Sequence, residues 1–136
     1  MEKSKKQDVL NDLITKFNMI IVGMVNHITE YYGDSNTICI SLVLDELIKN
    51  QPDTLISYFL LNIYRNDEYR LNILKQNDEF FIKHNYEKLV GRDNDNVSKI
   101  FEFKKLWSKV DIDTKNFIKK SMLALVKLCQ TYILAL

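Results

Sequence analysis

The amino-acid sequence predicts an all-α protein, and three observations lead to this fold class. Only three glycines and one proline occur in 136 residues, too few for the many tight turns of a β-sandwich. Apolar residues recur at spacings of three and four along most of the chain, as the buried side of a helix requires. They make up 46% of the composition, which is typical of a globular protein with a core. We therefore predict one domain over residues 1–136, a helical bundle of about five to seven helices with a flexible segment over residues 1–6.

The first predicted helix runs from about Gln7 to Tyr32. Its apolar stripe comprises Leu10, Leu13, Phe17, Ile20, Met24 and Ile28. Gly23 interrupts the helical pattern and is expected either to permit the close approach of another helix or to mark a bend. His27 lies beside the stripe, where a partly buried, hydrogen-bonded histidine is favoured over a ligand or a proton donor.

Shorter helices follow in the middle of the chain. Gly33 is expected to end the first helix in a left-handed conformation, and a second helix follows over residues 35–50. A third is predicted over residues 52–66, because proline suits the first helical turn. A short amphipathic segment over residues 69–76 precedes another helix, which begins at residue 77 or 78.

The clearest predicted loop covers residues 91–96, and its Asp-Asn-Asp-Asn run resembles the start of a calcium loop. Valine, serine and lysine then occupy three positions where such a loop requires an oxygen ligand, glycine and glutamate, so a solvated connector is favoured. A helix over residues 97–109 comes next. It places Phe103 and Trp107 on one face, where core packing is favoured over an exposed hot spot.

The last predicted helix, Asp111 to Leu136, is apolar on most of its faces. Asp111 can cap its first turn, and Asp113 places negative charge where the helix dipole favours it. Its apolar seam comprises Ile118, Met122, Leu125, Cys129, Tyr132 and Leu136. Such a helix is normally buried at the centre of a bundle or against a partner. Lys127 interrupts the apolar run, so we predict no membrane span.

The two cysteines, Cys39 and Cys129, both lie in apolar runs. Lone cysteines in such runs are usually small core residues, and neither has the spacing of a metal ligand or of a disulfide framework. No secretory signal is evident near the beginning of the sequence, because no apolar segment closely follows the basic residues. We therefore expect an intracellular, reducing environment.

Sequence motifs give no indication of catalysis. The chain contains no P-loop, dinucleotide-binding, nucleophile-elbow or zinc-protease pattern. Its two histidines are too far apart in the sequence to form a metal-binding motif. We expect a protein that is not an enzyme and that has no catalytic residues, cofactor or metal.

Charge is balanced overall at +1 but is distributed unevenly. Residues 97–136 carry eight lysines and three acidic residues, whereas residues 1–96 carry more acidic than basic ones. Either the two parts attract each other, or the lysines form a surface for a polyanion such as nucleic acid. The candidate contacts for a polyanion are Lys104, Lys105, Lys109, Lys115, Lys119 and Lys120.

These features favour a helical interaction or structural protein that acts through protein–protein contacts. The candidate interface residues are Phe103, Trp107, Met122 and Leu125. Homo-oligomerisation through the first or the last helix is expected, because a small domain need not bury both completely. The alternatives are a nucleic-acid-binding module that uses the C-terminal lysines and a helical groove that binds a partner helix.

The C-terminal 35 residues or so carry a pattern that runs from Phe103 to Leu128. It reads Phe103-x3-Trp107, then Asp113-x-Lys115-x2-Ile118-x3-Met122-x2-Leu125-x2-Leu128. This pattern resembles the ending of small uncharacterised helical proteins encoded by large nucleocytoplasmic DNA viruses of eukaryotes. Those proteins favour an aromatic residue where Ser121 or Met122 stands here. The resemblance implies no activity, and it favours a viral protein that acts by binding in the host cytoplasm or the virion.

Overall fold

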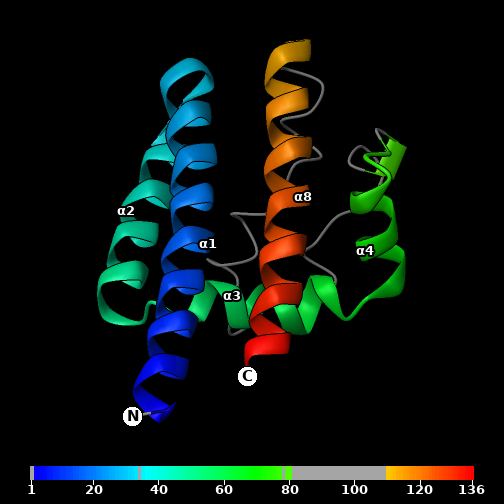
Figure 1. Ribbon diagram of the computed structural model, residues 1–136. Coiled ribbons are helices and arrows are strands. Elements are labelled where there is room, and N and C mark those ends of the chain that lie inside the picture. Colours follow the sequence, from blue (N-terminus) through cyan, green and yellow to red (C-terminus); the bar gives the residue numbers. More distant parts are fainter. Residues whose placement is uncertain (1, 34, 78, 81–109) are drawn as a thin grey trace.

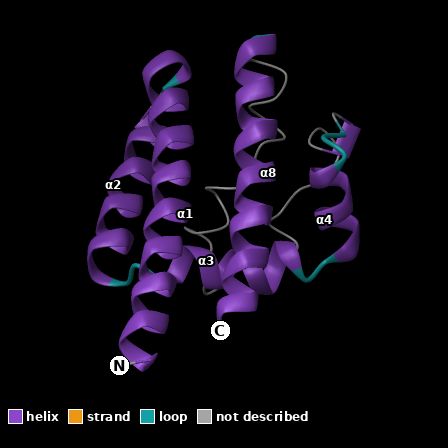
Figure 2. Cartoon of the chain, in the orientation of Figure 1, coloured by secondary structure: helices purple, strands orange, loops and turns teal. Residues whose placement is uncertain are grey.

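The computed structural model describes residues 2–33, 35–77, 79–80 and 110–136. All regular elements in these ranges are helical, which confirms the all-α class (Figure 2). In chain order they are α1 (Glu2–Tyr32), α2 (Ser35–Asn50), α3 (Thr54–Phe59), the π-helical turn η1 (Leu60–Tyr64), α4 (Asp67–Leu74) and α8 (Ile112–Ala135). The loop predicted over residues 91–96 and the helix predicted over residues 97–109 lie outside the described residues.

Helices α1 and α8 form the centre of the arrangement and run antiparallel (Figure 1). Helix α2 packs against α1, and α4 packs against α8, so these two shorter helices lie at opposite edges (Figure 1). The segment formed by α3 and η1 crosses the end of the bundle at which the C-terminus lies, and it joins α2 to α4 (Figure 1).

The core lies where α1, α8 and the α3–η1 segment meet. Phe17 of α1 packs edge-on against Phe59 of α3, with ring centroids 5.4 Å apart. Each fully buried side chain of this size contributes about 1.5–3 kcal/mol through removal from water. The other fully buried side chains include Ile21, Met24, Leu55, Ile56, Ile63, Ile73, Ile118, Met122, Leu125 and Cys129.

The described part of α1 begins at Glu2, earlier than the predicted start at Gln7, and ends at the predicted Tyr32. Polar character alone does not end a helix, because lysine, glutamate and glutamine are good helix formers. Just after these extra residues, the Gln7 Nε2 donates a hydrogen bond to the Asn11 Oδ1 at 2.9 Å on the exposed side of the helix.

The two described glycines of this region have different roles. Gly33 follows the end of α1 without a positive φ, so the predicted left-handed conformation is wrong. A Cβ atom at Gly33 would instead overlap the backbone carbonyl of Thr29, which explains why this position takes no side chain. Gly23 is exposed, and a Cβ atom there would meet nothing within 4 Å. No helix therefore packs closely on Gly23 among the described residues.

The region after α2 contains boundaries that the sequence did not predict. Pro52 lies in a turn, and α3 begins at Thr54 instead. The helix then widens into η1, where the Arg65 N–H donates to the Leu60 carbonyl at 3.1 Å, a five-residue separation. Helix α4 begins two residues earlier than predicted, because the Asn66 side chain caps it.

The start of α8 has the predicted cap. The Asp111 side chain accepts a hydrogen bond from the Thr114 N–H at 2.8 Å. The Asp111 N–H in turn donates to the Tyr32 hydroxyl at 3.1 Å. This pair of bonds ties the first turn of α8 to the last turn of α1, so the cap also fixes the two long helices relative to each other.

The glycines give a matched pair of stability predictions. Gly23→Ala is expected to raise the free energy of unfolding by about 0.5–1 kcal/mol, because alanine favours a helix and the added methyl group meets open space. Gly33→Ala is expected to lower it by more than about 1 kcal/mol through the overlap with Thr29. Urea unfolding followed by circular dichroism measures both. Equal effects of the two substitutions would contradict this account of the glycines.

The Asp111 cap predicts a pH effect. Hydrogen bonds from the Thr114 side chain and then from its backbone lower the pKa of the Asp111 carboxyl below its ordinary value. Because the folded pKa is the lower one, the cap stabilises the protein above the unfolded pKa and loses this effect as pH falls through the folded value. Asp111→Asn keeps a capping oxygen but cannot titrate. It should flatten the dependence of unfolding free energy on pH below about pH 5. An unchanged slope would refute this role.

Candidate functional site

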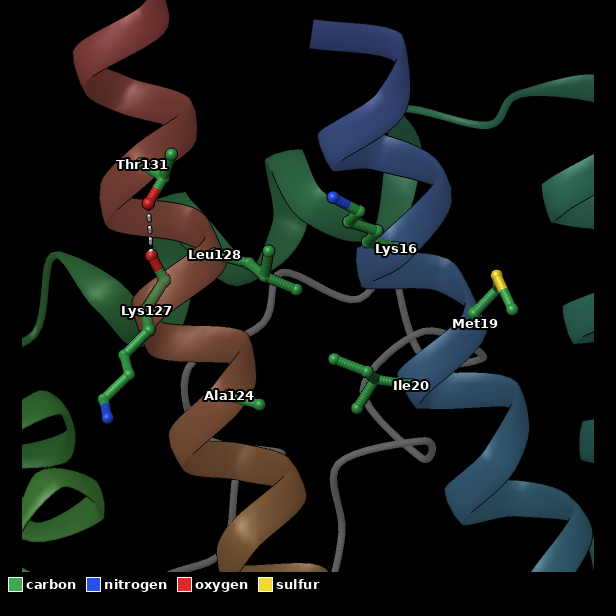
Figure 3. Close-up of a pocket in the computed structure, with 7 residues that line it drawn as sticks. All are labelled: Lys16, Met19, Ile20, Ala124, Lys127, Leu128 and Thr131. Atoms are coloured by element: carbon green, nitrogen blue, oxygen red, sulfur yellow. Dashed lines mark hydrogen bonds between the residues drawn. The ribbon is translucent and has the colours of Figure 1, made fainter. Parts of the chain in front are cut away.

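A groove lies between α1 and α8 and is the candidate site (Figure 3). It has a volume of about 530 Å³. Its lining residues are Lys16, Met19 and Ile20 of α1 and Ala124, Lys127, Leu128 and Thr131 of α8. Side chains three and four residues apart share one side of a helix, so Gly23 continues the α1 line of Lys16 and Ile20. The small side chain of Ala124 leaves room between the two helices.

The floor of the groove is apolar. Ile20 and Leu128 are half-buried and pack against the core cluster, so one side of each contacts the interior. Met19 is 67% exposed, a large value for an apolar side chain. Methionine is unbranched and adapts its shape to a partner surface. The groove thus presents apolar side chains to whatever binds there.

Lysines flank this apolar floor. Lys16 stands on α1 and extends toward α8, whereas Lys127 stands on α8 and extends away from α1 (Figure 3). Lys120, at helical spacing from Ala124 and Lys127, adds a third exposed ammonium group to the same side of α8. The Lys16 Nζ lies 3.0 Å from the Asp12 Oδ2, but both side chains are about 60% exposed, and such a surface pair is weak. The rim therefore carries net positive charge.

His27 joins α1 to α8 beyond the groove. Its Nε2 lies 3.1 Å from the Thr114 Oγ1, and its ring stacks on Phe117 with centroids 4.9 Å apart. The centroid of the Tyr31 ring lies 4.8 Å from the centroid of the His27 ring. The predicted half-buried, hydrogen-bonded histidine is confirmed. Its role here is to hold the two helices together.

The structure places two of the predicted interface residues inside the protein. Met122 and Leu125 are fully buried in the core cluster, so the predicted interface has no exposed side chain at these positions. Phe103 and Trp107 lie outside the described residues. Sequence reasoning missed Met19, whose signal was an apolar residue on the otherwise polar side of its helix.

The predicted lysine surface divides between two sides of α8. Lys115 and Lys119 are four residues apart on one side, and both are half-buried. Lys120 is exposed and lies about 100° further around the helix, toward the groove. Lys104, Lys105 and Lys109 lie outside the described residues. The candidate contacts did not include Lys16, which lies outside the lysine-rich segment, or Lys127, which lies within it but apart from the other lysines in the sequence.

Helix α2 presents a second apolar surface, which we call the α2 face: Ile38, Cys39, Leu42, Asp45 and Glu46. Ile38 is 53% exposed and Leu42 is 62% exposed. A hollow of about 400 Å³ extends beside them, lined by Leu42, Val43, Glu46, Leu47, Asn50 and Gln51. On the same side of α2, the Asn50 Nδ2 donates a hydrogen bond to the Glu46 Oε2 at 3.0 Å.

The two cysteines have different environments. Cys129 is buried in the core, as predicted, and burial raises the pKa of its thiol to about 12. Cys39 is exposed, so the prediction that it lies in the core is wrong. The difference arises because α2 lies at the edge of the bundle and leaves one side uncovered, which its sequence pattern alone did not specify.

Within the described ranges, no group of three or more histidine, cysteine, aspartate or glutamate side chains could hold a metal ion. A search of the same residues finds no helix with both the length and the hydropathy to cross a membrane. Comparison with known proteins gives no match for this chain, whether to a family model, to a curated protein or to a solved structure. The resemblance to viral helical proteins stays a prediction.

The cysteine environments predict two labelling rates. In the folded protein a maleimide should modify Cys39 rapidly and leave Cys129 unmodified, because only the former thiol is exposed and the latter is held protonated by burial. Mass spectrometry should show one adduct under native conditions and two in denaturant. Cys39→Ser should abolish the native adduct. Rapid native modification of Cys129 would contradict the observed packing of α8.

Proposed function

We propose that this protein is a non-enzymatic interaction protein whose groove between α1 and α8 binds an amphipathic helix of a protein partner. The observation that supports this function is the apolar lining of Ile20 and Leu128, with the exposed Met19 beside them, in a groove between two long helices (Figure 3). Helix-in-groove recognition uses this arrangement, in which the apolar side of one helix lies along a hydrophobic channel.

The shape of the groove favours a helix over a small molecule. Sites for small molecules usually enclose most of the ligand surface. Here Met19 is two-thirds exposed, and the flanking Lys16 and Lys127 are exposed as well. A channel that is open along its length suits an extended partner, which brings its own apolar stripe and remains solvated on its other side.

The lysines on the rim favour an acidic partner. Lys16, Lys120 and Lys127 would attract carboxylates placed on either side of a partner's apolar stripe. Rim charges of this kind set the orientation and selectivity of binding more than its overall strength. The partner is therefore an amphipathic helix with glutamate or aspartate beside its apolar side.

A synthetic peptide tests this function directly. The probe is an amphipathic helical peptide with a leucine stripe flanked by glutamate, and its control has lysine in place of each glutamate. The glutamate peptide should bind about tenfold more tightly, and Lys127→Glu should reduce that preference by a similar factor, about 1.4 kcal/mol. Methyl NMR shifts should appear at Met19, Ile20 and Leu128 but not at the exposed Leu71 of α4.

Three outcomes would count against the proposal. Binding of neither peptide at millimolar concentration, or equal binding of both, would show that the groove does not select an acidic helix. Shifts centred on Leu71 would place the contact elsewhere. Retention of a DNA duplex at about 50 mM salt, with a steep loss at higher salt and no peptide binding, would favour the nucleic-acid alternative instead.

A further inference from the structure

We infer that the helix that occupies the groove is α2 of a second copy of this chain, so that copies join head to tail. This inference rests on the proposed function of the groove and names its partner. It brings together two surfaces that lie on different helices of one chain: the groove between α1 and α8, and the outward α2 face.

The α2 face has the pattern of a helix that docks into a groove. Ile38 and Leu42 are separated by four residues, so they lie one above the other on the same side. They are 53% and 62% exposed, whereas Leu44 on the inner side of α2 is fully buried. Apolar anchors at this spacing are what helix-in-groove recognition requires.

The charges of the two surfaces are complementary. Asp45 and Glu46 follow Leu42 by about one turn and are exposed, and the exposed Lys49 one turn further on still leaves these three residues with a net negative charge. In the part of the chain that the structure describes, neither carboxylate forms an ion pair, and Glu46 only accepts a hydrogen bond from Asn50. The groove offers Lys120 and Lys127, which are exposed and likewise form no ion pair with a described residue. Opposite charges on matching apolar surfaces favour the contact of α2 with the groove over a contact between the α2 helices of two copies.

The lengths also agree. On α8 the lining residues extend from Ala124 to Thr131, about 10 Å of helix at 1.5 Å per residue. On α2 the distance from Ile38 to Glu46 is about 12 Å on the same basis. One copy's α2 face can therefore place its apolar pair on the floor and its carboxylates near the lysines of the other copy.

The contact must form between copies, because α2 packs against α1 of its own chain (Figure 1). Its outward face therefore cannot turn into its own groove. A contact between two different surfaces leaves one unused groove and one unused α2 face on every pair, so a ring or an open chain of copies results.

Complementary variants test the head-to-tail contact in the full chain. Leu42→Asp with Glu46→Lys disables the α2 face, and Met19→Asp with Lys127→Glu disables the groove. All four residues are exposed, so the fold should tolerate the changes. In sedimentation experiments the unaltered chain should increase in mass with concentration, and each variant should associate at least about tenfold more weakly.

Mixing the two variants is the decisive measurement. Each retains one functional surface, so an equimolar mixture should form a heterodimer of about twice the 16.1 kDa chain mass. No larger species should form. In the mixture, maleimide modification of Cys39 should slow at least about threefold in the variant whose groove is disabled, because its intact α2 face, which includes this thiol, is the docked one. Leu71→Asp on α4 serves as the control and should leave self-association unchanged.

Two results would overturn the inference. If the unaltered chain stays monomeric up to millimolar concentration, α2 is not the occupant, although binding of the acidic peptide would still support the proposed function. If the variants fail to form a heterodimer while the unaltered chain associates, the copies meet through other surfaces. If the unaltered chain neither binds the acidic peptide nor associates with itself, the proposed function of the groove is wrong as well.

Discussion

The antiparallel packing of α1 against α8 is the contact on which the rest of this structure depends. It buries Phe17 and Ile21 from one helix and Met122 and Leu125 from the other, and the α3–η1 segment closes over them. At one end the two helices are held by polar bonds as well, from Asp111 to Tyr32 and between His27 and Thr114. The shorter helices α2 and α4 each pack on one member of this pair.

The same packing also forms the candidate site. Two helices that pack side by side separate toward the protein surface, and a small residue on that outer side leaves a channel between them. Ala124 lines that channel, while the apolar Ile20 and Leu128 reach down to the core. The proposed binding surface therefore requires no separate loop or insertion, because it follows from how the central helices meet.

The groove and the α2 face carry charges of opposite sign. Lysines of both long helices flank the groove, whereas Asp45 and Glu46 lie on α2. The overall charge is nearly balanced at +1, so attraction between copies or to an acidic helix comes from local arrangement and not from net charge.

The sequence by itself determined the fold class, the ends of α1 at Tyr32 and of α2 at Asn50, and the cap at Asp111. These features depend on local chemistry: helical spacing, helix breakers and short-range hydrogen bonds. Only the tertiary structure decided which sides of α2 and α8 are covered, and hence that Cys39 is exposed, Met122 is buried and Met19 faces a groove. A helix that is apolar on several sides fits several packings equally well, and contacts between residues distant in sequence select one of them.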